Sequence, residues 1–160
     1  MKRSCWVICA VLVLIVGFVG LELLAQATDP LVGTWELNIA KSKYNPGPPL
    51  KSSSRMFAAV ANGLKYSGKS VKADGTIFGT QWTAHFDGKD YPVTGDPDTD
   101  TMAIRRIDKF TIEGTAKKAG KVTYRVKHIV SQDGKASTLT VEGTDAQGKP
   151  YNNVLVFDKK

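Results

Sequence analysis

Turn signals recur along this chain at a spacing that suits strands. They are Asn62-Gly63, Asp74-Gly75, Asp87-Gly88, Gly95-Asp96-Pro97, Ala119-Gly120, Asp133-Gly134 and Gln147-Gly148. Asn-Gly and Asp-Gly tolerate the positive φ angles of tight hairpin turns. Most of these turns are 12 to 14 residues apart, an interval that leaves room for one strand and for no helix. The sequence therefore predicts repeated hairpins, which form an antiparallel meander.

The segments between the turns alternate apolar and polar residues, as strands with one buried face do. In residues 78–86, for example, the even positions carry Phe78, Trp82 and Phe86. Closing a sheet removes its exposed edges, so about eight to ten such strands predict an all-β, antiparallel up-and-down β-barrel. We expect strands near residues 32–39, 52–60, 64–72, 76–86, 89–94, 100–107, 109–116, 121–131, 136–143 and 150–158.

Gly33 and Trp35 open the first expected strand. Glycine allows the backbone to bend where a barrel must close, and an indole is large enough to plug its end. We interpret Gly33 and Trp35 as a structural plug, in preference to a ligand-stacking role for the indole.

Residues 1–27 have the form of a cleaved export signal. Met1-Lys2-Arg3 supplies a basic start, an unbroken apolar run extends over residues 6–21, and Ala25-Gln26-Ala27 has the small-x-small form that signal peptidase accepts. The run is shorter than the ~20 apolar residues that a membrane-spanning helix needs. We therefore expect cleavage after Ala27, one domain over residues 28–160, no stable membrane span after cleavage, and a periplasmic or extracellular location.

The composition of residues 28–160 excludes some classes of site. Both cysteines, Cys5 and Cys9, lie in the expected leader, so the mature chain would have no disulfide and no thiolate metal site. Without Lys2, Arg3 and Glu22 the chain has 20 basic and 14 acidic side chains, a net charge of +6. The lysines are spread and form no stripe, which indicates a solvated surface and no nucleic-acid face.

Residues 41–49 break the strand pattern. Three prolines in this segment lack the N–H groups of a strand ladder, so we expect a loop between the first and second strands, packed down by Tyr44. Such a loop could lie across one mouth of the barrel or serve as a spacer.

Two stretches resemble a known group of proteins. They are Asp-Pro-x-x-Gly-Thr-Trp-x-Leu-Asn-x-Ala-Lys-Ser-x-Tyr over residues 29–44, followed by Pro-Gly-Pro, and Lys-Asp-Tyr-Pro-Val-Thr-Gly over residues 89–95. Both are similar to small exported lipocalin-like proteins of soil bacteria, notably acidobacteria. The resemblance implies a calycin-type barrel, built around a cavity for small apolar molecules. Lipocalins proper carry an arginine after the final strand, close over the tryptophan, whereas this chain ends Phe157-Asp158-Lys159-Lys160.

Side-chain parity identifies candidate ligand-binding residues. Trp82 and Phe86 share one strand face, and Tyr124 and His128 share another, while the opposite faces carry polar and charged residues that should meet water. Arg106 has the parity of apolar neighbours and could hold an acidic head at a barrel mouth. We predict a cavity lined by Tyr66, Trp82, Phe86, Arg106, Tyr124 and His128.

His128 has three alternative interpretations. It could bind the carboxylate of a ligand, act as a base, or be a hydrogen-bonded core histidine. His85 falls on the opposite face from Trp82, and two histidines on separate strands without cysteines give weak support for a metal. No Gly-x-Ser-x-Gly elbow or phosphate loop is present, so we predict no cofactor, no metal site and no enzymatic activity.

The sequence thus predicts an exported barrel that binds a small hydrophobic or amphipathic molecule, such as a fatty acid. The alternative is a structural or surface-interaction protein of the envelope with a side-chain-filled barrel. The interior volume of the barrel should distinguish them.

Overall fold

The described part of the chain consists of strands. A computed structural model of the protein describes residues 29–145 and 147–160, and no helix occurs among these residues. The expected leader, residues 1–27, with its cleavage position after Ala27, lies outside the described residues. The ten strands are β1 (Gly33–Lys43), β2 (Ser52–Val60), β3 (Gly63–Val71), β4 (Ile77–His85), β5 (Tyr91–Thr94), β6 (Thr101–Arg106), β7 (Thr111–Lys118), β8 (Lys121–Val130), β9 (Ala136–Thr144) and β10 (Pro150–Lys159).

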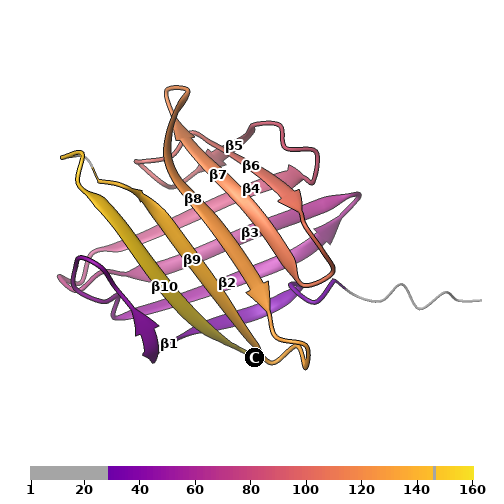
Figure 1. Cartoon of the computed structure of the whole chain (residues 1–160), viewed down its shortest axis with the longest axis horizontal. Helices are drawn as coiled ribbons and strands as arrows, with labels where there is room; N and C mark the ends of the chain where they lie inside the picture. Colours follow the sequence, from indigo (N-terminus) through magenta and orange to yellow (C-terminus); the bar gives the residue numbers. More distant parts are fainter. Residues whose placement is uncertain (1–28, 146) are drawn as a thin grey trace, which may run out of the picture.

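The strands close into one barrel. Each strand pairs antiparallel with its neighbours in chain order, and β1 also pairs with β10, so the sheet has no free edge strand. Figure 1 shows the strands coiled around one interior, with the C-terminus beside the loop that joins β8 and β9. The prediction of an all-β, antiparallel up-and-down barrel is confirmed. Within residues 29–145 and 147–160 no helix could cross a membrane.

The first strand is longer than the proline pattern predicts. It runs to Lys43, which pairs with Val154 of β10 after a register shift that follows Asn38. The irregularity lets the strand bend and resume pairing. The assignment of residues 41–43 to a loop was wrong, and the loop between β1 and β2 covers residues 44–51.

One end of the barrel, where β1 begins and β10 ends, is the closed end. Leu31 and Trp35 are fully buried there, and the indole N–H of Trp35 donates to the Leu31 carbonyl oxygen at 2.8 Å. The Lys159 ammonium lies 5.0 Å from the centre of the Trp35 ring and donates to the Pro30 carbonyl oxygen. A lysine, Lys159, thus lies over the ring of Trp35 at the closed end.

The segment before β1 is anchored by charge as well as by packing. Arg106, at the end of β6, forms an ion pair with Asp29. The same guanidinium carbon lies 4.3 Å from the centre of the Phe86 ring. Asp29 also accepts a hydrogen bond from the Leu31 amide at 2.9 Å, which turns the chain into the barrel end. Residues 29–31 therefore cover the closed end.

The opposite end is the open end. It carries the β1–β2 loop (residues 44–51), the β3–β4 loop (residues 72–76) and the β5–β6 loop (residues 95–100). The buried apolar side chains fill the closed end and continue along the inner wall of the barrel. They are Leu31, Trp35, Phe57, Leu64, Tyr66, Trp82, Ala84, Met102, Ile104, Ile112, Ala116, Val130, Leu139, Leu155 and Phe157.

Candidate functional site: a cavity at the open end

A cavity of about 680 Å³ occupies the half of the barrel next to the open end. This volume lies within the range of small-molecule sites. Its wall is mostly apolar, with aromatic rings and aliphatic side chains from both sides of the barrel. The residues whose interior faces form most of it are Leu50, Phe57, Tyr66, Phe78, Trp82, Met102, Ile104, Ile112, Tyr124, Val126, His128, Leu139, Val141, Tyr151 and Leu155.

Strand register builds the floor of this cavity. Phe57 pairs with Tyr66 across β2 and β3, and Tyr66 pairs with Trp82 across β3 and β4, so three aromatic side chains form one row. Tyr66 and Trp82 are stacked, with ring centres 5.0 Å apart and planes 22° from parallel. From β8, His128 reaches across the barrel to within 5.6 Å of the Phe57 ring centre. This contact divides the filled half from the open half.

Small residues above the floor keep the upper half hollow. On β3 the inward positions after Tyr66 are Gly68 and Ser70, and on β4 the inward position above Trp82 is Thr80. A methyl group at Gly68 would overlap the hydroxyl of Tyr66. Gly68 thus gives room to the Tyr66 side chain, and Ser70 and Thr80 are too small to fill the space above it.

The β1–β2 loop completes the wall at the open end. Tyr44, Pro46, Pro48 and Leu50 all line the cavity. Proline lacks an N–H group, so Pro46 and Pro48 present apolar rings toward the cavity without an unpaired backbone donor. The loop therefore contributes to the candidate site itself.

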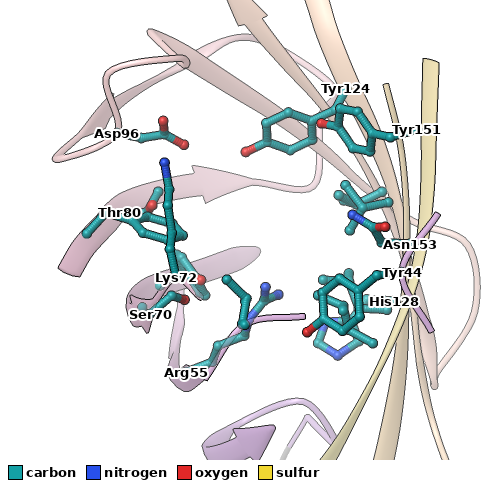
Figure 2. A pocket seen from close by; sticks show the side chains of 18 of the residues that line it. Tyr44, Arg55, Ser70, Lys72, Thr80, Asp96, Tyr124, His128, Tyr151 and Asn153 are labelled. Carbon is teal, nitrogen blue, oxygen red and sulfur yellow. The ribbon is translucent and has the colours of Figure 1, made fainter. Parts of the chain in front are cut away.

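Arg55 of β2 is the cationic side chain that reaches farthest into the cavity. Its guanidinium carbon lies 4.5 Å from the centre of the buried Phe157 ring, and Figure 2 shows its nitrogens pointing into the pocket. Among residues 29–145 and 147–160 it forms no ion pair, and its buried Nε has no hydrogen-bond partner. A guanidinium without a counter-charge in a largely apolar cavity is unusual, because desolvation of a charge is costly.

The carboxylates at the mouth have other partners. Asp74 accepts a hydrogen bond from the Thr76 amide at 2.8 Å, which lowers the pKa of its carboxyl group. Asp96 accepts from the Asp98 amide at 2.9 Å. Figure 2 shows Lys72 extending away from Arg55 and toward Asp96. The charges of the mouth and of the interior are thus spatially separate.

His128 is held in its neutral form. Burial, and then the nearby positive charge of Arg55, lower the pKa of this imidazole from 6.5 to about 3. Its Nε2 atom lies 2.9 Å from the hydroxyl oxygen of Ser137, which is also buried. At neutral pH such an imidazole can exchange hydrogen bonds with a ligand but carries no charge to attract one.

Two tyrosines border the upper part of the cavity. Figure 2 shows Tyr124 and Tyr151 beside each other on the wall opposite Lys72 and Asp96. Gly143 permits this arrangement, because a methyl group there would stand 2.8 Å from both Tyr124 Cβ and the Tyr151 hydroxyl. Burial raises the pKa of Tyr124 to about 12, so its hydroxyl stays protonated and can donate a hydrogen bond.

The six predicted ligand-binding residues separate into two groups. Tyr66, Trp82, Tyr124 and His128 line the cavity. Phe86 and Arg106 do not; they lie at the closed end, where Arg106 pairs with Asp29. An arginine engaged in this way does not stand at a cavity mouth, because residues 29–31 cover that end. The plug residues Gly33 and Trp35 lie at the same closed end.

Arg55 was missed by the sequence reasoning. The available signal was parity: Ser53, Arg55 and Phe57 share one face of β2, and both Ser53 and Phe57 are buried. The alternating positions Ser54 and Met56 are exposed. The buried apolar residue Phe57, two positions away, thus indicates that Arg55 points inward. It does not indicate how deep in the barrel Arg55 lies.

The described residues hold no cluster of three or more histidine, cysteine, aspartate or glutamate side chains arranged to bind a metal ion. His85, the second histidine, points away from the cavity and bonds through Nδ1 to the Ala61 carbonyl oxygen at 2.7 Å. The candidate site is a mostly apolar cavity with Arg55 in its interior and Lys72, Asp74 and Asp96 toward its mouth.

Comparison with known proteins identifies the fold and no family. No protein-family model matches the chain, and no curated protein matches it. The structure is similar to the crystal structure of Rv2717c from M. tuberculosis, with a TM-score of 0.50 and 14% sequence identity. The match covers 84% of this chain and 96% of that chain. At this identity the likeness extends to the barrel fold alone.

Proposed function

We propose that this protein is an exported, lipocalin-like binding protein that holds a small hydrophobic or amphipathic molecule in the barrel interior. The observation that carries the proposal is the cavity of about 680 Å³ above the floor formed by Phe57, Tyr66, Trp82 and His128. Apolar surface that is shielded from bulk water favours apolar ligands, because their transfer from water is favourable.

The cavity supports this function over a purely structural barrel. A side-chain-filled barrel needs large residues at every interior level, whereas the small residues Ser70 and Thr80 line the upper half. The neutral state of His128 supports binding over catalysis. An imidazole whose pKa is lowered to about 3 is a weak base at neutral pH.

Export is part of the proposal and is supported by sequence alone. The basic start, the apolar run over residues 6–21 and the Ala25-Gln26-Ala27 motif have the order of a cleaved signal. N-terminal sequencing of secreted or periplasmic material is expected to begin at Thr28. A mature protein that retains Cys9, or that stays in the inner membrane, would contradict export.

Binding can be tested with the neutral apolar probe N-phenyl-1-naphthylamine, whose fluorescence rises in an apolar environment. We expect saturable enhancement with the purified protein. Thr80→Phe should weaken probe binding by at least about tenfold, because the added ring enters the cavity beside Phe78 and Trp82.

Thr83→Phe is the matched control, since Thr83 lies on the same strand but on its exposed outer face. It should leave probe binding unchanged. If the folded protein gives no saturable enhancement, or if both variants bind equally well, the binding function is refuted.

A further inference from the structure

We propose that the ligand is an amphipathic monocarboxylate that binds with its carboxylate at Arg55, deep in the cavity, and its apolar chain toward the open end. The proposal rests on the proposed binding function and adds the class of ligand and its orientation. It differs from a head group held at the mouth, because the cationic residue concerned lies near the floor.

The first argument is charge. Arg55 contributes a guanidinium to a mostly apolar wall, and within residues 29–145 and 147–160 no carboxylate forms an ion pair with it. Its field reaches the interior groups, since it acts on His128, Tyr44 and Tyr124. A ligand with one negative charge would neutralise the single cation at this level of the cavity.

The second argument is the supply of hydrogen-bond donors around this guanidinium. The buried Nε of Arg55 has no partner among the described residues. Figure 2 shows the Tyr44 hydroxyl on the side of its ring that faces Arg55, and this buried hydroxyl has no hydrogen-bond partner among the described residues. These donors suit the two oxygens of a carboxylate.

A serine pair supplies a further donor next to Arg55. The hydroxyls of Ser53 and Ser70 are 2.8 Å apart, and Ser70 lines the cavity. Because only one proton is needed between them, the second hydroxyl proton is free to point at a ligand oxygen. Ser70 lies diagonally from Arg55 across β2 and β3, since Arg55 pairs with Gly68. Diagonal neighbours on one sheet face are within reach of a shared ligand group.

The third argument gives the orientation. Below Arg55 the barrel is filled, because Phe57 follows on the inner face of β2 and contacts Tyr66 and His128. Above it, the β1–β2 loop and Phe78 of β4 contribute apolar surface to the wall, and the charged side chains Lys72 and Asp96 lie at the mouth. An apolar chain attached to a carboxylate at Arg55 therefore has room along the cavity toward the open end.

Competition against N-phenyl-1-naphthylamine tests the ligand class. We compare dodecanoate with dodecanol, which has the same chain and no charge, at a pH where the acid is ionised. Dodecanoate should displace the probe at a concentration at least about tenfold lower than dodecanol, as expected for a charge-assisted hydrogen bond. Equal potency of the two compounds, with the probe still bound normally, would refute the inference and leave the general binding function intact.

Variants identify the responsible cation. Arg55→Met should remove the difference between acid and alcohol and retain probe binding, while Arg55→Lys should keep part of the difference because it keeps the charge. Lys72→Met, which removes a cavity-lining cation at the mouth, should keep the full difference. A full difference in Arg55→Met, or its loss in Lys72→Met, would refute the assignment to Arg55. If Arg55→Met does not fold, as judged by circular dichroism, Arg55→Lys decides: an undiminished difference there refutes the assignment of the carboxylate to the Arg55 guanidinium.

The orientation is tested by quenching of Trp82 in the floor. Dodecanoate that is brominated next to the carboxylate should quench more strongly than dodecanoate brominated at the far end of its chain. The comparison is made in Trp35→Phe, because Trp35 pairs with Arg55 across β1 and β2 and would add its own quenching near the head group. Adding Trp82→Phe should then abolish the contrast. Stronger quenching by the far-end bromine would place the head group at the mouth and overturn the proposal.

Discussion

The buried imidazole of His128 should make the stability of this protein depend on pH between pH 7 and pH 5. In the folded chain, burial and the charge of Arg55 lower the pKa of this group from 6.5 to about 3. When the pH falls through 6.5, the unfolded chain takes up a proton at His128 and the folded chain does not. Acidification therefore stabilises the unfolded state relative to the folded state. The free energy of unfolding should decrease as the pH falls through this window.

The size of the effect follows from the two pKa values. At pH 7 both states are mostly neutral at His128, whereas at pH 5 the unfolded state is protonated and the folded state is still neutral. A shift of one pKa unit corresponds to about 1.4 kcal/mol, so we expect the free energy of unfolding to fall by about 2 kcal/mol between pH 7 and pH 5.

Carboxyl groups contribute below this window. Hydrogen bonds lower the pKa of Asp100 and of Asp133 from the ordinary value of 3.8. Their stabilising contribution is present above the pKa of the unfolded chain and is lost only as the pH falls below it. Measurements at pH 7, 6 and 5 therefore isolate the imidazole.

Urea unfolding, followed by far-ultraviolet circular dichroism at constant ionic strength, measures the effect. His128→Gln should abolish the slope between pH 7 and pH 5, although loss of the contact with Ser137 will change the absolute stability. His85→Gln removes the other histidine and should keep the slope. A free energy of unfolding that is the same at pH 5 and pH 7 within about 0.5 kcal/mol would mean that His128 binds its proton in the folded state, and the reasoning would fail.

Three further predictions concern the closed end and the turns, each measured by urea unfolding at neutral pH. Trp35→Ala should lower the free energy of unfolding by about 3–5 kcal/mol because it empties the closed end, and Trp35→Phe should lower it less. Equal losses in the two variants would contradict the role of Trp35 as a structural plug. Asp29→Asn should lower the free energy of unfolding by about 1–3 kcal/mol, because it leaves Arg106 partly buried without its carboxylate. Adding Arg106→Met should lower it little further. Additive losses in the double variant would mean that the pair is not coupled. Gly63→Ala should cost at least about 2 kcal/mol because its methyl group would overlap the Ala84 carbonyl oxygen; Gly134→Ala, with φ +69° and no neighbour within 4 Å, should cost only about 1 kcal/mol.

Most of the barrel could be predicted from local patterns. A hairpin turn needs residues that accept positive φ, and the structure has such angles at Asn62 (50°) and at Ala119 (48°) followed by Gly120 (76°). Between turns, alternation of side chains assigns the inner face of each strand without knowledge of its partners. The inward positions of Tyr66, Trp82, Tyr124 and His128 follow from this alternation alone.

The charge of the candidate site could not be predicted in this way. Arg55 and Arg106 both share a face with apolar residues, so parity places both toward the interior. Parity gives the face of a strand, but not the depth of a residue along the barrel axis. Depth depends on the register of all ten strands, and the sequence does not show that register.

The end at which the barrel closes is also a tertiary property. Residues 29–31 fold over the end where β1 begins, and Asp29 pairs there with Arg106. Arg55 pairs with Trp35 on one side and with Gly68 on the other, and its side chain lines the cavity. The sequence by itself thus determined the strands, the turns and the inner faces, because these depend on neighbours along the chain. Only the closed sheet decided which arginine meets a carboxylate of the protein and which one faces an open cavity, because that depends on residues brought together from distant strands.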